Sequence, residues 1–323
     1  MKNDALFSFI VPVFNEEETI EPLFEALFDL KSKIDGRIEI IVVDDGSFDN
    51  SLEVLKQFQS KHDGIKLLSF SRNFGHQVAM TAGMDVAEGD AVILLDADLQ
   101  DPPLVAIEMI EKWREGYDMV YGKRRSREGE TFLKKVTATI FYRCLKSLAT
   151  IDIPEDTGDF RLLDRKVLKA VNSMRETDRY MRGLFSWVGF KQTEVLYERK
   201  ERVAGETHYP FRKMLRLAFA AIMGFSDVPL KVAVALGFVI SIGAACYAIL
   251  AVAQAFITDT AVAGWSSMII VTSFLNGLLL SMLGIVGLYI GRIHEENKRR
   301  PLYIVKESFG LTKVPTAERA LYF

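Results

Sequence analysis

The sequence predicts an α/β fold, a mostly parallel sheet with helices on both faces, followed by a C-terminal two-helix transmembrane hairpin. Two observations predict it. In the first part of the chain, short apolar runs alternate with amphipathic segments, which is the pattern of a parallel sheet covered on both faces. Further on, the uncharged stretches between Lys231 and Asp259 and between Asp259 and Arg292 each exceed the roughly 20 residues that cross a hydrocarbon core.

Composition narrows the class of protein. The chain has 323 residues, of which 49% are apolar, and a net charge of -3. A chain of this length can hold two functional parts, and it lacks the basic excess that is typical of nucleic-acid binding. Cys144 and Cys246 lie in regions of opposite character, so we expect free thiols in a reducing compartment. The scattered histidines show no zinc-ligand spacing.

The individual elements follow from the apolar periodicity. Strands are expected at Phe7–Val13, Ile38–Val43, Ile65–Ser71, Ala91–Asp96 and Met119–Gly122. Helices are expected between them at Thr19–Lys33, Ser51–Lys61, Gln77–Ala87 and Pro103–Arg114. The last residues, Ala317–Phe323, fit no element and are excluded from the predicted fold.

Polar side chains follow the predicted strands, where the carboxyl ends of a parallel sheet place its ligands. Asp96 and Asp98 flank a single residue after a buried strand, and carboxylates so close together repel each other unless a cation lies between them. Mg²⁺ or Mn²⁺ bridging to a substrate diphosphate is the simplest explanation. No dinucleotide fingerprint and no P-loop occurs in the sequence. Each motif alone also fits a turn, and Asp101 before Pro102 is expected to cap a helix.

The combination resembles a known family. Residues Phe9–Phe160 look like the GT-A catalytic domain of the family 2 glycosyltransferases. With Asp156–Arg161, Arg202–Thr207 and the paired apolar spans, the resemblance covers nearly the whole chain and extends to the polyprenyl-phosphate glycosyltransferases, of the bactoprenol glucosyltransferase and dolichol-phosphate mannose synthase type. It implies a GT-A, Rossmann-like fold and a metal-dependent hexosyltransferase.

The resemblance also implies roles for particular residues. The nucleotide sugar would bind to Pro12, Asn15, Glu17, Asp44, Asp45, Asp96 and Gln100, and the Mg²⁺ or Mn²⁺ to Asp96, Asp98 and Gln100. The implied catalytic residues are Asp98, Asp159 and Arg202. Asp159 occupies the position of the presumed base. However, a phosphate monoester loses its second proton near about pH 6, so our hypothesis is that Asp159 positions the acceptor and nearby cations.

An anionic acceptor that approaches an anionic donor needs cations. Arg202 is expected on the donor diphosphate and Lys134 or Lys135 on the lipid phosphate, with Arg124 and Arg161 as further candidates. A solvated charge run explains Arg124–Arg127 as well. His208 stands where the family often has Lys, which leaves its role open.

Charge placement predicts the membrane topology. Basic residues flank both apolar spans, whereas the connector Ile257–Ser266 has none, so the positive-inside rule places both termini in the cytoplasm. The expected organisation is a cytoplasmic catalytic domain, an interfacial amphipathic helix in contact with membrane lipids, two transmembrane helices and a cytoplasmic tail, at residues 1–208, 209–228, 229–292 and 293–323. The interfacial segment also fits a helix docked on the soluble domain. Gly287 and Gly291 could pack the hairpin on itself or on a second subunit of a homo-oligomer.

The expected activity is inverting transfer of a hexose, by resemblance glucose from UDP-glucose, to undecaprenyl phosphate by one in-line displacement. The product would be a lipid-linked sugar donor for cell-envelope glycosylation, made at the bacterial plasma membrane. A GDP-mannose-dependent transferase and a catalytically inactive, membrane-tethered nucleotide-sugar binding protein remain alternatives. A processive synthase is disfavoured because no Gln-x-x-Arg-Trp motif occurs and only two spans are present.

Overall fold

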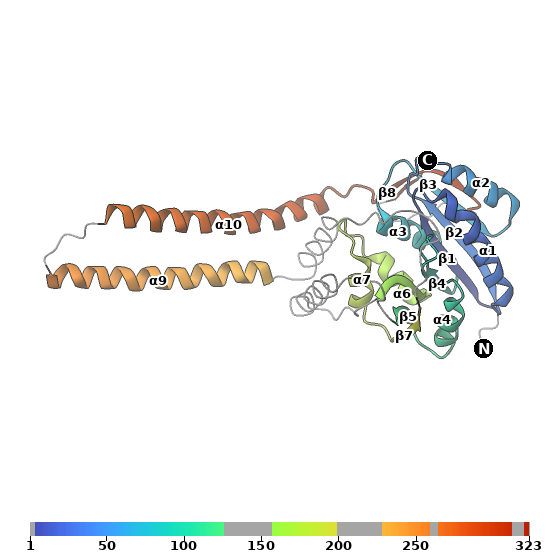
Figure 1. The fold of residues 1–323 in the computed structure, drawn as a ribbon, viewed down its shortest axis with the longest axis horizontal. Coiled ribbons are helices and arrows are strands. Elements are labelled where there is room, and N and C mark those ends of the chain that lie inside the picture. The colour runs from blue at the N-terminus through green and yellow to red at the C-terminus, as the bar shows by residue number, and fades with distance from the viewer. Residues whose placement is uncertain (1–3, 126–156, 199–227, 259–263, 312–319, 323) are drawn as a thin grey trace.

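The computed structural model describes residues 4–125, 157–198, 228–258, 264–311 and 320–322. An α/β domain carries two long helices that extend away from one side of it (Figure 1). The predicted α/β class is confirmed, since a mostly parallel central sheet is covered by helices on both faces.

The sheet has nine strands in the order β7-β5-β6-β4-β1-β2-β3-β8-β9. Strands β4, β1, β2 and β3 run parallel to one another, whereas β6 is antiparallel to β4 and β8 is antiparallel to β3. Their bounds are β1 Leu6–Val13, β2 Arg37–Asp44, β3 Ile65–Phe70, β4 Ala91–Leu94, β5 Met119–Arg124, β6 Thr157–Asp164, β7 Gln192–Tyr197, β8 Tyr303–Phe309 and β9 Ala320–Tyr322.

The helices divide between the two faces of the sheet. One core cluster joins the sheet to α1, α2 and α4, and the other joins it to α3, α6 and α7. On the second face, a Cβ added at Gly83 of α3 would lie 2.3 Å from Cγ2 of Ile10, so this helix packs directly on β1. The bounds are α1 Glu17–Lys33, α2 Ser51–Lys61, α3 His76–Val86, α4 Val105–Arg114, α6 Arg165–Ser173, α7 Met181–Trp187, α9 Val228–Thr258 and α10 Trp265–Asn297.

Each strand and helix expected before residue 125 is present, and no end differs from the expected one by more than two residues. Strand β4 ends at Leu94, so Asp96 lies in the loop after the strand. The exclusion of Ala317–Phe323 is wrong, because Ala320–Tyr322 forms β9 and pairs in parallel with β8. Short strands at the end of the chain carry little periodicity, and their pairing depends on partners far away in the sequence.

The two long helices expose apolar side chains along their length. Phe238 in α9 and Leu280 in α10 are each 68% exposed. Within the described part of the chain, Phe274–Asn297 is long and apolar enough to span a membrane, and none of its most apolar window is buried. The predicted interfacial helix at 209–228 lies almost wholly outside the described residues.

The two helices do not pack at the glycines that the sequence singled out. A Cβ added at Gly237 of α9 would lie 3.5 Å from Cε of Met282 in α10, which marks their contact. At Gly287 and Gly291 an added Cβ would meet no described atom within 4 Å. Among the described residues, the contact between α9 and α10 therefore does not involve these glycines.

Candidate active site

The loop after β2 is tied to the loops beside it. Asp44 ends β2, and its carboxylate accepts hydrogen bonds from the Ser47 N–H at 3.1 Å and from the Ser69 hydroxyl at 2.8 Å. Gly46 has a φ of 69°, and a Cβ there would lie 2.5 Å from the carbonyl carbon of Arg72. Glycine is needed at this position both for its conformation and for the close approach of the two backbones.

Asp45 joins the same loop to the one after β3. Its carboxylate accepts hydrogen bonds from the N–H groups of Phe74 at 2.7 Å and Gly75 at 2.9 Å. Burial raises the pKa of Asp45 to about 6, although these two N–H groups act in the opposite direction. Asp44 and Asp45 are only 1% and 2% exposed, so in this structure both carboxylates hold the backbone after β2 and β3.

The predicted residues after β1 connect to the loop after β2. Asn15 has a φ of 54°, and its side-chain oxygen accepts a hydrogen bond from the Phe48 N–H at 2.8 Å. Glu17 accepts one from the Asn50 N–H at 3.0 Å. Pro12 is buried in β1 opposite Val43 of β2, and it therefore shapes the strand end from within the sheet.

The predicted metal ligands lie in the loop after β4. Asp98 is 8% exposed and accepts a hydrogen bond at 3.1 Å from the backbone N–H of Gln100. Leu99 between them has a φ of 56°, which forms the tight turn. The Asp96 side chain is 29% exposed, and one of its oxygens lies 3.2 Å from Nε2 of His76, the first residue of α3.

Asp159 of β6 reaches the same place from the other half of the sheet. Nε of Arg182 in α7 donates to its carboxylate at 2.8 Å, and Nε2 of His76 lies 3.9 Å from its second oxygen. Asp96, His76, Asp159 and Arg182 thus form a continuous line of alternating charge across the carboxyl edge of the sheet.

The charges in this line stabilise one another. Burial by itself would raise the pKa of Asp159, but Arg182, His76 and Arg161 outweigh it and hold the pKa well below the usual range of a carboxyl group. Loss of hydration at the ring lowers the pKa of His76, whose side chain is still 44% exposed, and the neighbouring Asp96 and Asp159 carboxylates outweigh it and raise the pKa to about 9. At neutral pH the aspartate is therefore ionised and the histidine is protonated.

The two described arginines that were expected on the lipid phosphate lie close to Gly158. Arg161 is buried, donates to the Gly158 carbonyl at 3.1 Å, and places its guanidinium 4.3 Å from the centre of the Phe185 ring. Burial lowers the pKa of Arg161 to about 10, although Asp159 raises it. A terminal nitrogen of Arg124 lies 3.4 Å from the position of a Cβ added at Gly158. Arg161 therefore supports the start of β6, which carries Asp159, and Arg124 lies beside it.

The expectation that Asp101 caps a helix is wrong. Helix α4 begins at Val105, its N-cap is Leu104, and no side chain caps it by a hydrogen bond. Asp101 is buried and instead accepts a hydrogen bond from the Tyr197 hydroxyl at 2.5 Å. Tyr197 is brought there by β7, which pairs with β5, so a tertiary contact replaced the local one.

Some predicted residues are not placed, and some placed residues were not predicted. Arg202, Lys134 and Lys135 lie outside the described residues. Sequence reasoning missed His76 and Arg182. His76 directly follows the polar stretch after the third predicted strand, which is a signal that could have found it. Arg182 had no such signal, because it reaches Asp159 only through the packing of α7.

Known proteins resemble this chain over most of its length. The glycosyl transferase family 2 model matches residues 8–171. The uncharacterized glycosyltransferase YkcC of Bacillus subtilis is 48% identical, covering 96% of each chain. The uncharacterized glycosyltransferase sll0501 of Synechocystis is 44% identical over 95% of this chain and 97% of its own. The prophage bactoprenol glucosyl transferase homolog of Escherichia coli is 38% identical over 93% of this chain and 98% of its own. The chain therefore belongs to glycosyl transferase family 2 and is a glycosyltransferase.

Proposed function

We propose that this glycosyltransferase moves glucose from UDP-glucose to undecaprenyl phosphate at the cytoplasmic face of a bacterial membrane, with inversion at the anomeric carbon. Bactoprenol glucosyl transferases that are 38% identical over 93% of the chain support the substrates. The observation that carries the proposal is the line from Asp96 through His76 and Asp159 to Arg182, which places carboxylates and cations together at the carboxyl edge of the sheet.

On the donor side, the residues present suit a divalent cation. The described residues contain no group of three His, Cys, Asp or Glu side chains placed to hold a metal ion. Mg²⁺, however, is commonly held by one or two carboxylates, with substrate phosphates and water as its other ligands. Asp96 and Asp98, with Gln100 beside them, would provide such a set. When bound, Mg²⁺ or Mn²⁺ supplies positive charge to the leaving diphosphate.

On the acceptor side, Asp159 acts as a positioning group. Its ion pair with Arg182 and its lowered pKa make it a weak base, and the lipid phosphate is mostly a dianion above about pH 6. The phosphate oxygen forms a bond to the anomeric carbon while the bond from that carbon to the donor diphosphate breaks, and UDP leaves. Arg182 and His76 supply positive charge near the acceptor, so catalysis rests on positioning and electrostatics.

The membrane part of the proposal rests on the exposed apolar surface of α9 and α10. A soluble monomer rarely exposes so much contiguous apolar surface, and Phe274–Asn297 has the length and composition of a membrane span. We propose the organisation 1–208, 209–228, 229–292 and 293–323, with the catalytic domain and both termini in the cytoplasm. Arg202 would serve the donor diphosphate, and Lys134 or Lys135 the lipid phosphate. A homo-oligomer would cover part of the apolar surface.

Transfer assays with a panel of donors test this function. The purified full chain in detergent is given undecaprenyl phosphate and UDP-glucose, UDP-N-acetylglucosamine or GDP-mannose, with Mg²⁺, Mn²⁺ or EDTA. We expect a glucosylated lipid from UDP-glucose with either metal ion and none with EDTA. Preferred transfer from GDP-mannose would establish the mannosyltransferase alternative. Donor binding without hydrolysis or transfer under any condition would indicate an inactive nucleotide-sugar binding protein.

A further inference from the structure

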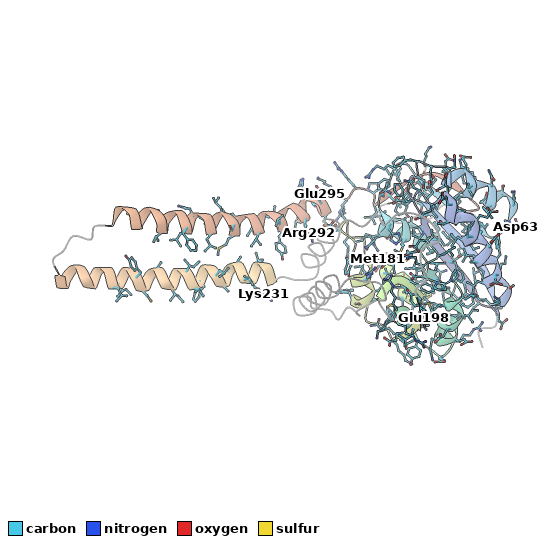
Figure 2. All side chains as sticks on the ribbon, in the orientation of Figure 1. Asp63, Met181, Glu198, Lys231, Arg292 and Glu295 are labelled. Atoms are coloured by element: carbon cyan, nitrogen blue, oxygen red, sulfur yellow. The ribbon has the colours of Figure 1, made fainter. Side chains whose placement is uncertain are left out.

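Residues 174–180, which connect α6 to α7, are held by contacts from distant parts of the chain. Arg175 forms two hydrogen bonds with Asp85 of α3, at 3.0 and 2.6 Å. The backbone N–H of Thr177 donates to Glu296 near the end of α10 at 2.8 Å. Arg292, one turn earlier in α10, lies 3.4 Å from the Asp178 carboxylate. Figure 2 shows Arg292 at the end of α10 that faces the α/β domain.

The same connection leads directly into the candidate active site. Immediately after it, the Met181 N–H donates to the side chain of Gln77 at 2.9 Å. The next residue, Arg182, pairs with Asp159. Gln77 follows His76 at the start of α3. The contacts with α10 are therefore separated from the charged line of the site by only a few residues of backbone.

The segment after α10 also contacts Asp85, the partner of Arg175. Tyr303 of β8 is fully buried, and its hydroxyl donates to the carboxylate of Asp85 at 2.7 Å. The Tyr322 hydroxyl of β9 lies 3.0 Å from that of Tyr303. Asp85 thus binds both Arg175 and the C-terminal strands. The end of α10 is fixed to the domain through its own side chains and through the strand after it.

We propose that Arg292 and Glu296 are positioning residues, which hold the 174–180 connection so that Arg182 stays oriented on Asp159. The inference rests on the proposed function of that site. It makes turnover depend on how the end of the membrane helix is seated on the catalytic domain. Displacements of about 1 Å far from the chemistry can lower rates by roughly 100-fold when catalysis rests on positioning.

The contacts of α10 with the 174–180 connection are partly exposed, so a positioning role can be tested apart from a purely structural one. The side chains of Arg292 and Asp178 are 26% and 68% exposed, and ion pairs at such sites contribute little to the free energy of unfolding. Removing them should therefore leave the fold intact. The buried Asp85 cluster continues to hold β8 and β9 in the variants.

The experiment compares Arg292→Ala, Glu296→Ala and Glu296→Gln with wild type, each also in an Arg182→Ala background. We expect the two alanine variants to lower kcat by roughly 10-fold or more with unchanged binding of UDP-glucose. Glu296→Gln, which keeps an acceptor oxygen for the Thr177 N–H, should recover much of the rate. In the Arg182→Ala background the losses should largely disappear, because residues that act through one group are not additive.

Glu295→Ala is the matched control, since Glu295 pairs with Lys298, directly after the end of α10, and its removal should leave kcat unchanged. The inference would be overturned if the losses of kcat were additive with that of Arg182→Ala, or if Glu295→Ala lost as much kcat as the other variants. Activity of the wild type would still uphold the proposed function in that case. Hydrogen exchange at residues 174–182 tests the inference without turnover. Exchange should quicken in Glu296→Ala and stay unchanged in Glu295→Ala, and an unchanged rate in both would also overturn it.

Discussion

The two halves of the candidate site are built differently. The proposed donor half consists of loops that directly follow the parallel strands β1, β2 and β4. It is held by hydrogen bonds that backbone N–H groups donate to carboxylates, such as those of Asp44 and Asp45. The acceptor half places Asp159 on the antiparallel strand β6 and holds it by ion pairs with side chains from α3 and α7. The donor half therefore depends on local backbone geometry, and the acceptor half depends on charges that come from distant segments.

The largest expected effect is in the donor half. Asp98→Asn removes one of the two carboxylates proposed to hold the cation, so we expect turnover to fall on the order of 10³-fold, because preorganised charge at a leaving group has that value. Initial rates of lipid glucosylation with Mg²⁺ measure it. Glu108→Gln, at an exposed position in the nearby α4, is the control. Wild-type rates in Asp98→Asn would show that the loop after β4 does not bind the cation.

The burial of Asp45 in the proposed donor half should make the free energy of unfolding depend on pH. The pKa of Asp45 is about 6 in the folded chain and 3.8 in its unperturbed form, so the folded state binds more protons between these values. Stability is then lost as pH rises from about 4 to 6, by roughly 3 kcal/mol at most. Urea unfolding across this pH range checks it: Asp45→Asn should lack this slope. An equal slope in both proteins would contradict the assignment.

The acceptor half is tested through its ion pair. Arg182→Ala leaves the carboxylate of Asp159 without its closest cation, so we expect kcat for lipid glucosylation to fall roughly 100-fold with little change in KM for UDP-glucose. Arg182→Lys should restore only part of the rate, because one ammonium group does not reproduce the guanidinium geometry. A variant that instead raised KM for UDP-glucose would place Arg182 in the donor half.

A smaller effect is expected from the buried contacts of Asp85 with Arg175 and Tyr303, which hold the connection between α6 and α7. Tyr303→Phe removes one of the hydrogen bonds to the buried Asp85 and leaves those from Arg175, so we expect a loss of about 1–3 kcal/mol in the free energy of unfolding. Thermal unfolding by circular dichroism measures it. Tyr322→Phe, whose parent residue is more exposed, should cost less. Equal stability of Tyr303→Phe and wild type would indicate that the hydrogen bond from Tyr303 to Asp85 does not stabilise the domain.

Sequence reasoning predicted the parallel strands on which the proposed donor half is built. Continuous apolar runs identified the parallel strands, and the polar residues after them lie at one edge because the carboxyl ends of parallel strands meet there. Asp96 and Asp98 were selected from the sequence, as was Asp159 in the proposed acceptor half, and the family was recognised from the same motifs. Each of these signals is local, so a chain read residue by residue contains it.

The tertiary structure decided the rest, because it brings together residues that no local pattern connects. Arg182 meets Asp159 only when α7 packs beside β6, and Asp101 binds Tyr197 only when β7 joins the sheet. Strands β8 and β9 follow the long apolar helix α10 and extend the sheet at one edge. Strand β8 pairs with β3, which lies far away in the chain, and β9 pairs with β8. The sequence by itself thus determined the strands, the apolar helices and the acidic motifs, whereas the placement of cations and the C-terminal strands depended on long-range packing.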